Sequence, residues 1–351
     1  MRRIPLMGVL VLLALTPPAS AATVAYRTPA MGPVLAGSDV VWGEEARDGS
    51  IRVVRGAPRE VAWSLAPTTA PRSERGFMHT PWALAASEHG WAALPYVGTV
   101  TSESFDSVST SIDIAAVSAH WGEPPAVVSG EIADRGDRQC APGSWSAGAV
   151  AVDGDRVAVA ETACATFEQR VVVDGTAVPV GDVPRALALA GRWLAWTTGV
   201  GAGDSLTICD LSTGQRALRL TRGDLGRWIE DIDLAEDGRV LFTMAGPGDF
   251  GSLLAIAQPG VPEVRHLLRR VAPRGIALAG DGVLYTRYKD RHYRRSVLKL
   301  ESIEGGIVRK LATFRRGRRQ VGDVDLSESR AVWAVRGARV THGRRIVLRR
   351  L

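Results

Sequence analysis

Three carboxylates stand within four positions of one another in the sequence, at Glu230, Asp231 and Asp233. Carboxylates this close together can divide general-acid and general-base roles, as in glycosidase or lyase chemistry. The alternative is that they cap strand ends or bind a cation. The motifs HExxH, GxSxG, paired CxxC and GxxxxGK[ST] are all absent. These three residues are therefore the only, weak catalytic candidates, and the sequence indicates no cofactor and no metal site.

A strongly basic segment near the C-terminus is the second feature that could do chemistry. Residues 260–351 hold 23 of the 43 basic and 8 of the 37 acidic residues, a net charge of +15 against −9 for the rest. Arginine binds phosphate or carboxylate through two hydrogen bonds, and clustering raises the local potential. The candidate ligand-binding residues lie in neighbouring loops of this segment: Arg287, Lys289, Arg291, His292, Tyr293, Arg294, Arg295, Arg315, Arg316, Arg318, Arg319, Arg344 and Arg345.

Composition supplies a competing explanation for these arginines. Only Lys289, Lys299 and Lys310 are lysines, so 40 of the 43 basic residues are Arg. This bias, together with abundant Ala, Gly and Val, is typical of a GC-rich bacterial genome. The basic segment is then either a site for polyanions or a solvated surface that reflects composition, and both interpretations stay open at this point.

The N-terminus indicates export. Arg2 and Arg3 precede an apolar stretch from Met7 to Leu15, and Ala19-Ser20-Ala21 forms a small-residue cleavage site, so residues 1–21 are predicted to be a signal peptide. The apolar stretch is shorter than the roughly 20 residues that span a bilayer. We expect a secreted, periplasmic or cell-envelope bacterial protein, without a transmembrane segment once the signal is removed.

The three cysteines of the sequence fit an oxidising compartment. One pair can form a disulfide and one thiol must remain. In a propeller built from the repeats of this sequence, Cys140 and Cys164 lie in loops at the same end of neighbouring sheets, so these two are predicted to pair. Cys209 falls within a strand and is predicted to be a buried free thiol.

A repeated phrase predicts the elements that hold these residues. It consists of a few apolar residues alternating with small ones, a Gly/Asp/Ser turn and a further apolar run, and it recurs at intervals of 37 to 68 residues. Period-two alternation with turn residues at this repeat length predicts the blades of a β-propeller. The copies begin the segments 33–43, 82–94, 149–160, 186–196, 232–243, 276–286 and 324–335.

The fold class predicted from these repeats is all-β, a seven-bladed propeller of four-stranded blades forming a single domain over residues 22–351. The final repeat has only three strands, and residues 23–37 resemble the passage at 266–280 that joins one blade to the next. An N-terminal strand is therefore predicted to complete the last blade and close the ring. Residues 82–94 could also form a helix, so six or eight blades are the alternatives.

The turns EDGRVLF (236–242), GDGVLYT (280–286) and CDLSTGQ (209–215) resemble those of TolB-like and WD-repeat propellers. The resemblance covers nearly the whole mature chain but is architectural. It implies a propeller that binds other molecules, and it assigns no site residues.

The long connections all fall on one face of the predicted ring, which we call the top face. They are residues 66–81, 97–109, 131–147, 161–167 and 221–230, whereas the turns of the opposite face are tight. Binding sites are commonly built on such loops. We therefore expect a monomeric, non-catalytic binding or scaffold protein whose partner is a protein, an anionic envelope polymer or a glycan, rather than nucleic acid. The alternative is an enzyme that uses carboxylates near the central channel.

Overall fold

The computed structural model describes residues 22–25, 29–46, 50–56, 59–65, 84–104, 107–129, 145–163, 166–199, 204–246, 251–290, 292, 294–306, 308–315, 319–337 and 345–351. The strands of these residues form five antiparallel four-stranded sheets and one eight-stranded sheet, and the two halves of the eight-stranded sheet each have the same four-strand order. We call the resulting seven four-stranded units blades. Blade 1 contains β2 (Pro29–Ala36), β3 (Asp39–Glu45), β4 (Ile51–Arg55) and β5 (Glu60–Leu65); blade 2 contains β6 (Ala85–Ala86), β7 (Trp91–Ser104), β8 (Ser107–His120) and β9 (Ala126–Ser129); blade 3 contains β10 (Trp145–Asp153), β11 (Arg156–Ala163), β12 (Gln169–Val173) and β13 (Thr176–Pro179).

The remaining four blades continue the same order. Blade 4 contains β14 (Pro184–Ala190), β15 (Trp193–Thr198), β16 (Ser205–Asp210) and β17 (Gln215–Thr221); blade 5 contains β18 (Trp228–Leu234), β19 (Val240–Ala245), β20 (Ser252–Gln258) and β21 (Val261–Val271); blade 6 contains β22 (Ala277–Ala279), β23 (Gly282–Tyr288), β24 (Arg295–Ser302) and β25 (Arg309–Arg315); blade 7 contains β26 (Arg319–Leu326), β27 (Arg330–Gly337), β28 (Arg345–Arg350) and β1 (Ala22–Ala25).

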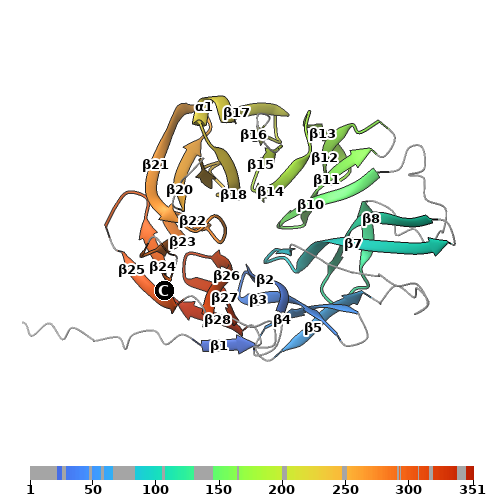
Figure 1. The fold of residues 1–351 in the computed structure, drawn as a ribbon, viewed down its shortest axis with the longest axis horizontal. Coiled ribbons are helices and arrows are strands. Elements are labelled where there is room, and N and C mark those ends of the chain that lie inside the picture. Colours follow the sequence, from blue (N-terminus) through green and yellow to red (C-terminus); the bar gives the residue numbers. More distant parts are fainter. Residues whose placement is uncertain are drawn as a thin grey trace, which may run out of the picture.

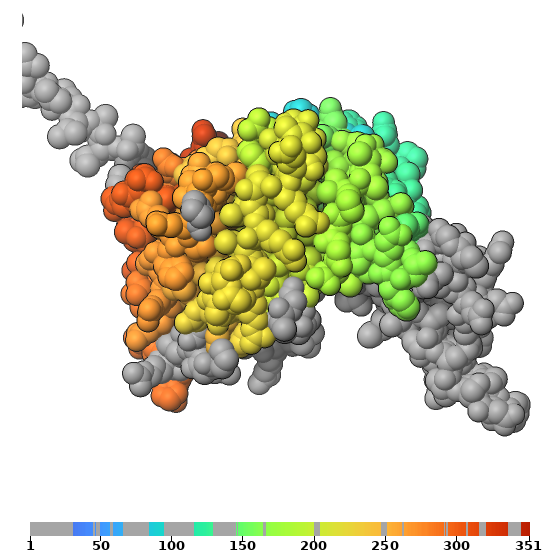
Figure 2. All heavy atoms as spheres, turned by 90° about the horizontal axis from the view of Figure 1, so that it is seen from above, coloured from blue at the N-terminus to red at the C-terminus, as the bar shows by residue number. Residues whose placement is uncertain are grey.

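The blades stand around a central axis in sequence order, with the first strand of each blade innermost (Figure 1). These innermost strands contact one another in succession, from β2 through β6, β10, β14, β18 and β22 to β26, and β26 returns to β2. In the side view of Figure 2, blades 3 to 6 follow one another from green to orange. The predicted all-β propeller is confirmed.

The ring closes with strands from both ends of the chain. β1 pairs antiparallel with β28, with Ala22 opposite Leu348 and Thr23 opposite Val347. This N-terminal strand is the outer strand of blade 7, as the sequence predicts. Because it covers the backbone of β28, the last blade does not present that unpaired edge to solvent.

Two features of the connections differ from the sequence expectation. The connection expected at residues 97–109 of blade 2 is different: its described residues, 97–104 and 107–109, belong to β7 and β8, whose register runs unbroken from Trp91 opposite His120 to Ser104 opposite Ser107. The expected loop at 221–230 contains a one-turn helix, α1 (Arg222–Leu225), capped by Thr221. Alternating Thr, Ser and Val side chains favour the extended hairpin, and the Thr221–Asp224 capping box favours the helix.

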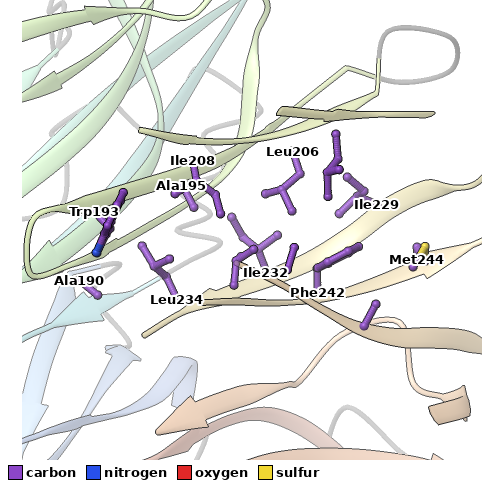
Figure 3. Packing of buried hydrophobic residues seen from close by; sticks show 14 of the residues in the cluster. Ala190, Trp193, Ala195, Leu206, Ile208, Ile229, Ile232, Leu234, Phe242 and Met244 are labelled. Atoms are coloured by element: carbon purple, nitrogen blue, oxygen red, sulfur yellow. The ribbon is translucent and has the colours of Figure 1, made fainter. Parts of the chain in front are cut away.

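The core is distributed between neighbouring blades. Between blades 4 and 5, Ala195, Leu206 and Ile208 face Ile232 and Phe242, all of them buried (Figure 3). Similar clusters lie at the other joints of the ring, so each sheet buries apolar side chains on both of its faces. Burying one such side chain contributes about 1.5–3 kcal/mol, and the sum over the ring makes the scaffold rigid enough to position its loops.

Candidate functional site

The described part of the predicted basic site lies on blade 6. Arg287 is at the end of β23, Arg295 begins β24, and Arg315 ends β25. Lys289, His292 and Arg294 occupy the connection between β23 and β24. These residues meet at the top face because β23 and β25 both end there and β24 begins there. Of the other candidates, Arg319 is in β26, while Arg291, Tyr293, Arg316, Arg318 and Arg344 fall outside the described residues.

Strand pairing brings two of these cations side by side. Arg295 is the direct cross-strand partner of Arg315 in the β24–β25 ladder, and both side chains are exposed. Like charges in such a pair repel each other. This repulsion lowers the stability of the protein when no anion is bound. An anion that bridges the two guanidinium groups would remove the repulsion.

The acid within this loop is used to hold the turn. Asp290 Oδ1 accepts hydrogen bonds from the backbone N–H groups of His292 (3.1 Å) and Arg294 (2.8 Å). These hydrogen bonds, led by the one from Arg294, lower the pKa of Asp290 below its ordinary value. The loop is closed by a backbone hydrogen bond from Lys289 N to Arg295 O (2.9 Å). Asp290 thus shapes the loop, and within the described part of the chain it forms no ion pair with Lys289 or Arg294.

The exposed cations at the top of blade 6 differ in their ion pairing from several arginines of earlier blades. In blades 1, 3 and 4, several arginines are paired with acids: Arg55 with Asp39 and Glu60, Arg59 with Glu44, Arg156 with Asp153, Arg170 with Glu161, and Arg192 with Asp210. No acid of the described chain pairs with Lys289, Arg294, Arg295 or Arg315. All four side chains are exposed. Their positive potential is therefore not cancelled by a described ion pair.

Arg345 differs from the exposed cations. It begins β28 and is half-buried, and its Nε atom is buried without a hydrogen-bond partner in the structure. The Arg345 side chain is therefore partly enclosed by blade 7 and is less accessible than the exposed cations.

The second candidate site lies on the innermost strands of the ring, where two carboxylates occupy equivalent positions in β18 and β26. Asp233 of β18 accepts from Leu278 N of blade 6 (2.6 Å) and from Leu234 N (2.9 Å). Asp325 of β26 accepts from Leu35 N of blade 1 (2.6 Å) and from Leu326 N (2.7 Å). Each carboxylate thus reaches a backbone donor at the inner edge of the next blade and ties two blades together.

Burial shifts the ionisation of these groups. Loss of hydration raises the pKa of Asp233 to about 6 and that of Asp325 to about 7, and the charge of Asp233 contributes to the second shift. Asp231, which accepts from Gly275 N (3.0 Å), has its pKa raised to about 7 by burial. Asp231, Asp233 and Asp325 are half-buried.

These contacts restrict the catalytic interpretation of Glu230, Asp231 and Asp233. Glu230 accepts a hydrogen bond from the Ser252 hydroxyl. Both oxygens of Asp233 accept hydrogen bonds from backbone donors, and one of these donors belongs to the next blade, so the side chain connects blades 5 and 6. Raised pKa values would suit a general acid. The bonding, however, is that of a structural tether.

Sequence reasoning missed Asp325, although a signal was present. The segments Ile232-Asp233-Leu234 and Val324-Asp325-Leu326 place Asp at the same point of the repeat, where the other copies have Val or Ala. Only the ring geometry shows that this position faces the inner edge of the following blade.

Other predicted features have mixed outcomes. Cys209 is buried and free, as predicted, and burial raises the pKa of its thiol. Cys140 and Cys164 fall outside the described residues, so their pairing stays a prediction. Within the described ranges, no group of three His, Cys, Asp or Glu side chains is arranged to hold a metal. The helices of those ranges include none long and apolar enough to cross a membrane.

Comparison with known proteins supports the fold and adds no family. No family model matches the sequence, and no curated protein matches it. A chain of Kuenenia stuttgartiensis hydrazine synthase is similar in structure, with a TM-score of 0.51 and 14% identity over 92% of this chain and 98% of that one. The β-propeller domain of the trilobed protease of Pyrococcus furiosus has a TM-score of 0.50 and 10% identity, over 74% and 79% of the two chains.

The second of these structures differs from the present chain in how its ring closes. It is described as having an open velcro topology. In the present chain, β1 pairs with β28 and closes the last blade. At such low identities the similarity concerns the fold alone, and function has to be inferred from the residues of this chain.

Proposed function

We propose that this protein is an exported, non-catalytic binding propeller that holds an anionic polymer of the cell envelope on the top face of blade 6. One observation carries the proposal. Four exposed cations, Lys289, Arg294, Arg295 and Arg315, gather at one end of blade 6, where no described acid pairs with them. An anionic polymer would supply the missing countercharges, and Arg295 and Arg315 could bind one of its acidic groups together.

The channel carboxylates favour binding over catalysis. An enzyme of glycosidase or lyase type needs two carboxyl groups free to face a substrate. Asp233 and Asp325 instead direct their oxygens at backbone donors of the next blade. The channel therefore supports a rigid ring, and the exposed cations are the better candidate for contact with a ligand.

The test is retention on heparin, used as a model polyanion, over a series of salt concentrations. The variant carries Arg295→Ser and Arg315→Ser. Its matched control carries Arg216→Ser and Arg219→Ser, which remove two exposed arginines from β17, the outer strand of blade 4. The two variants have the same net charge, so a difference between them reports position on the ring.

We expect the blade 6 variant to elute at clearly lower salt, with the slope of log affinity against log salt reduced by about 1–2. The control should elute close to the unmodified protein. Equal losses in the two variants would mean that retention follows net charge, and the proposal would then be wrong. Thermal unfolding of each variant checks that the fold is intact.

A further inference from the structure

The outer strand of blade 5 ends beside the basic loop of blade 6. Val271, the last residue of β21, pairs with Arg287 of β23, so blades 5 and 6 form one continuous eight-stranded sheet. A backbone hydrogen bond from Ala272 N to Thr286 O (2.7 Å) supports the joint. The last residues of β21 are therefore held next to the strand that leads into Lys289.

The residue before this joint has an unusual backbone. Arg270 has φ of +65°, in the left-handed region that favours glycine. It is the extra residue of a β-bulge, since Ser252 pairs with Val271 while Leu253 pairs with Arg269. The side chain is exposed. A bulge of this kind changes the direction in which a side chain leaves the sheet.

Space around the bulge is also limited. A Cβ atom on Gly251, whose φ is +70°, would lie 3.0 Å from Arg270 Cα and 3.1 Å from Val271 O. The two facing strand ends approach so closely that glycine is required at position 251. Glycine would also suit position 270, yet the chain has an arginine there. Strained residues of this kind concentrate at functional positions because the strain holds a side chain where a ligand needs it.

We propose that Arg270 is a ligand-binding residue that extends the basic site across the joint between blades 5 and 6. This inference rests on the proposed function and deepens it, because it specifies the ligand as a linear polyanion that crosses from blade 5 to blade 6. Arg270, Lys289, Arg295 and Arg315 then contact successive acidic groups of one polymer. A single small anion could not reach all of them, so affinity should increase with chain length.

The test uses three variants and fluorescently labelled heparin fragments of increasing length. Arg270→Gly removes the guanidinium group and keeps the left-handed backbone available. Arg270→Lys keeps the charge at the same position. Arg269→Gly removes the neighbouring cation at a position that is not in the left-handed region, and it is the control for stability.

We expect Arg270→Gly to unfold at the same or a higher temperature than the unmodified protein, whereas Arg269→Gly should unfold at a lower one. Arg270→Gly should bind long heparin fragments about 3-fold or more weakly and lose part of their advantage over short ones. Arg270→Lys should restore most of the affinity.

Three results would contradict the inference in different ways. Unchanged binding by Arg270→Gly, with reduced binding by the Arg295 and Arg315 variant, would exclude Arg270 and leave the proposed function in place. Unchanged binding by all of these variants would overturn both. A fall in the unfolding temperature of Arg270→Gly as large as that of Arg269→Gly would show that the backbone at position 270 is not strained.

Discussion

When Asp325 is replaced by asparagine, the pH should decide whether the variant or the unmodified protein is the more stable of the two. Asp325 connects blade 7 to blade 1, at the seam where the two ends of the ring meet, through its hydrogen bond from Leu35 N (2.6 Å). Its pKa is raised from 3.8 to about 7, first by burial and also by the charge of Asp233. Asparagine has nearly the same shape and carries no charge.

The direction of the pH dependence follows from how many protons the folded and unfolded states bind. Between about pH 4 and pH 7 the folded protein keeps a proton on Asp325 that the unfolded chain has already lost, so the free energy of unfolding falls as the pH rises through this window. The stability contributed by this group is complete below 3.8 and lost above about 7. The shift corresponds to about 4 kcal/mol at 1.36 kcal/mol per pKa unit.

Asparagine does not undergo this loss. Asp325 accepts a backbone N–H at each of its two oxygens, whereas asparagine has one acceptor oxygen and turns its NH₂ group toward the second N–H. At about pH 4.5 the variant should therefore be the less stable protein by about 1 kcal/mol. At about pH 8 the variant should be the more stable protein by about 2 kcal/mol, because the unmodified protein then holds a poorly hydrated carboxylate whose cost exceeds that of the hydrogen bond lost in the variant.

Urea unfolding followed by tryptophan fluorescence measures both proteins over this pH range. Trp333, which is buried in blade 7, is a suitable reporter. Asp323→Asn is the matched control, since Asp323 is exposed on the same strand. Parallel stability curves for Asp325→Asn and the unmodified protein would refute the reasoning, as would an unmodified protein that is the more stable of the two at pH 8.

Three further outcomes are expected. Gly238→Ala should destabilise the protein by about 2 kcal/mol or more in urea unfolding, because the φ of Gly238 is +85° and the added Cβ would lie 2.7 Å from the buried Trp193 ring. Gly175→Ala should cost only about 1 kcal/mol, because Gly175 has a similar φ of +79° but open space around it. Deleting residues 22–25 should expose the edge of β28, and light scattering should then detect association between chains. Maleimide labelling followed by mass spectrometry should leave Cys209 unmodified in the folded protein and modify one thiol in the unfolded, unreduced protein; two or three modified thiols would contradict the predicted disulfide.

Much of the ring could be predicted because propeller blades are local structures. Each blade is a run of consecutive hairpins, so alternation and turn residues such as Gly280-Asp281-Gly282 indicate its strands directly. The closing strand could be predicted as well, because the last repeat is one strand short. The extended β7–β8 hairpin was missed because its Thr and Ser residues suit a loop as well as a strand.

The site could be predicted less completely. The sequence indicated an accumulation of positive charge, and the strand order could place it at one end of blade 6. It could not show that Asp290 serves its own loop, that Arg295 faces Arg315, or that the described cations of this loop lie without acidic partners. Ion pairing depends on which side chains meet in three dimensions, and composition does not specify this.

Periodicity and turn residues are enough to predict most of the blade strands and their order, and the strand that is missing from the last repeat predicts the one that closes the ring. The roles of individual side chains, in contrast, depend on contacts between blades. Asp233 and Asp325 bind backbone groups in the next blade, 45 and 290 positions away in the sequence. Val271, which follows the bulge at Arg270, pairs with Arg287 of blade 6. Such contacts depend on how the blades pack around the ring, which no local pattern encodes.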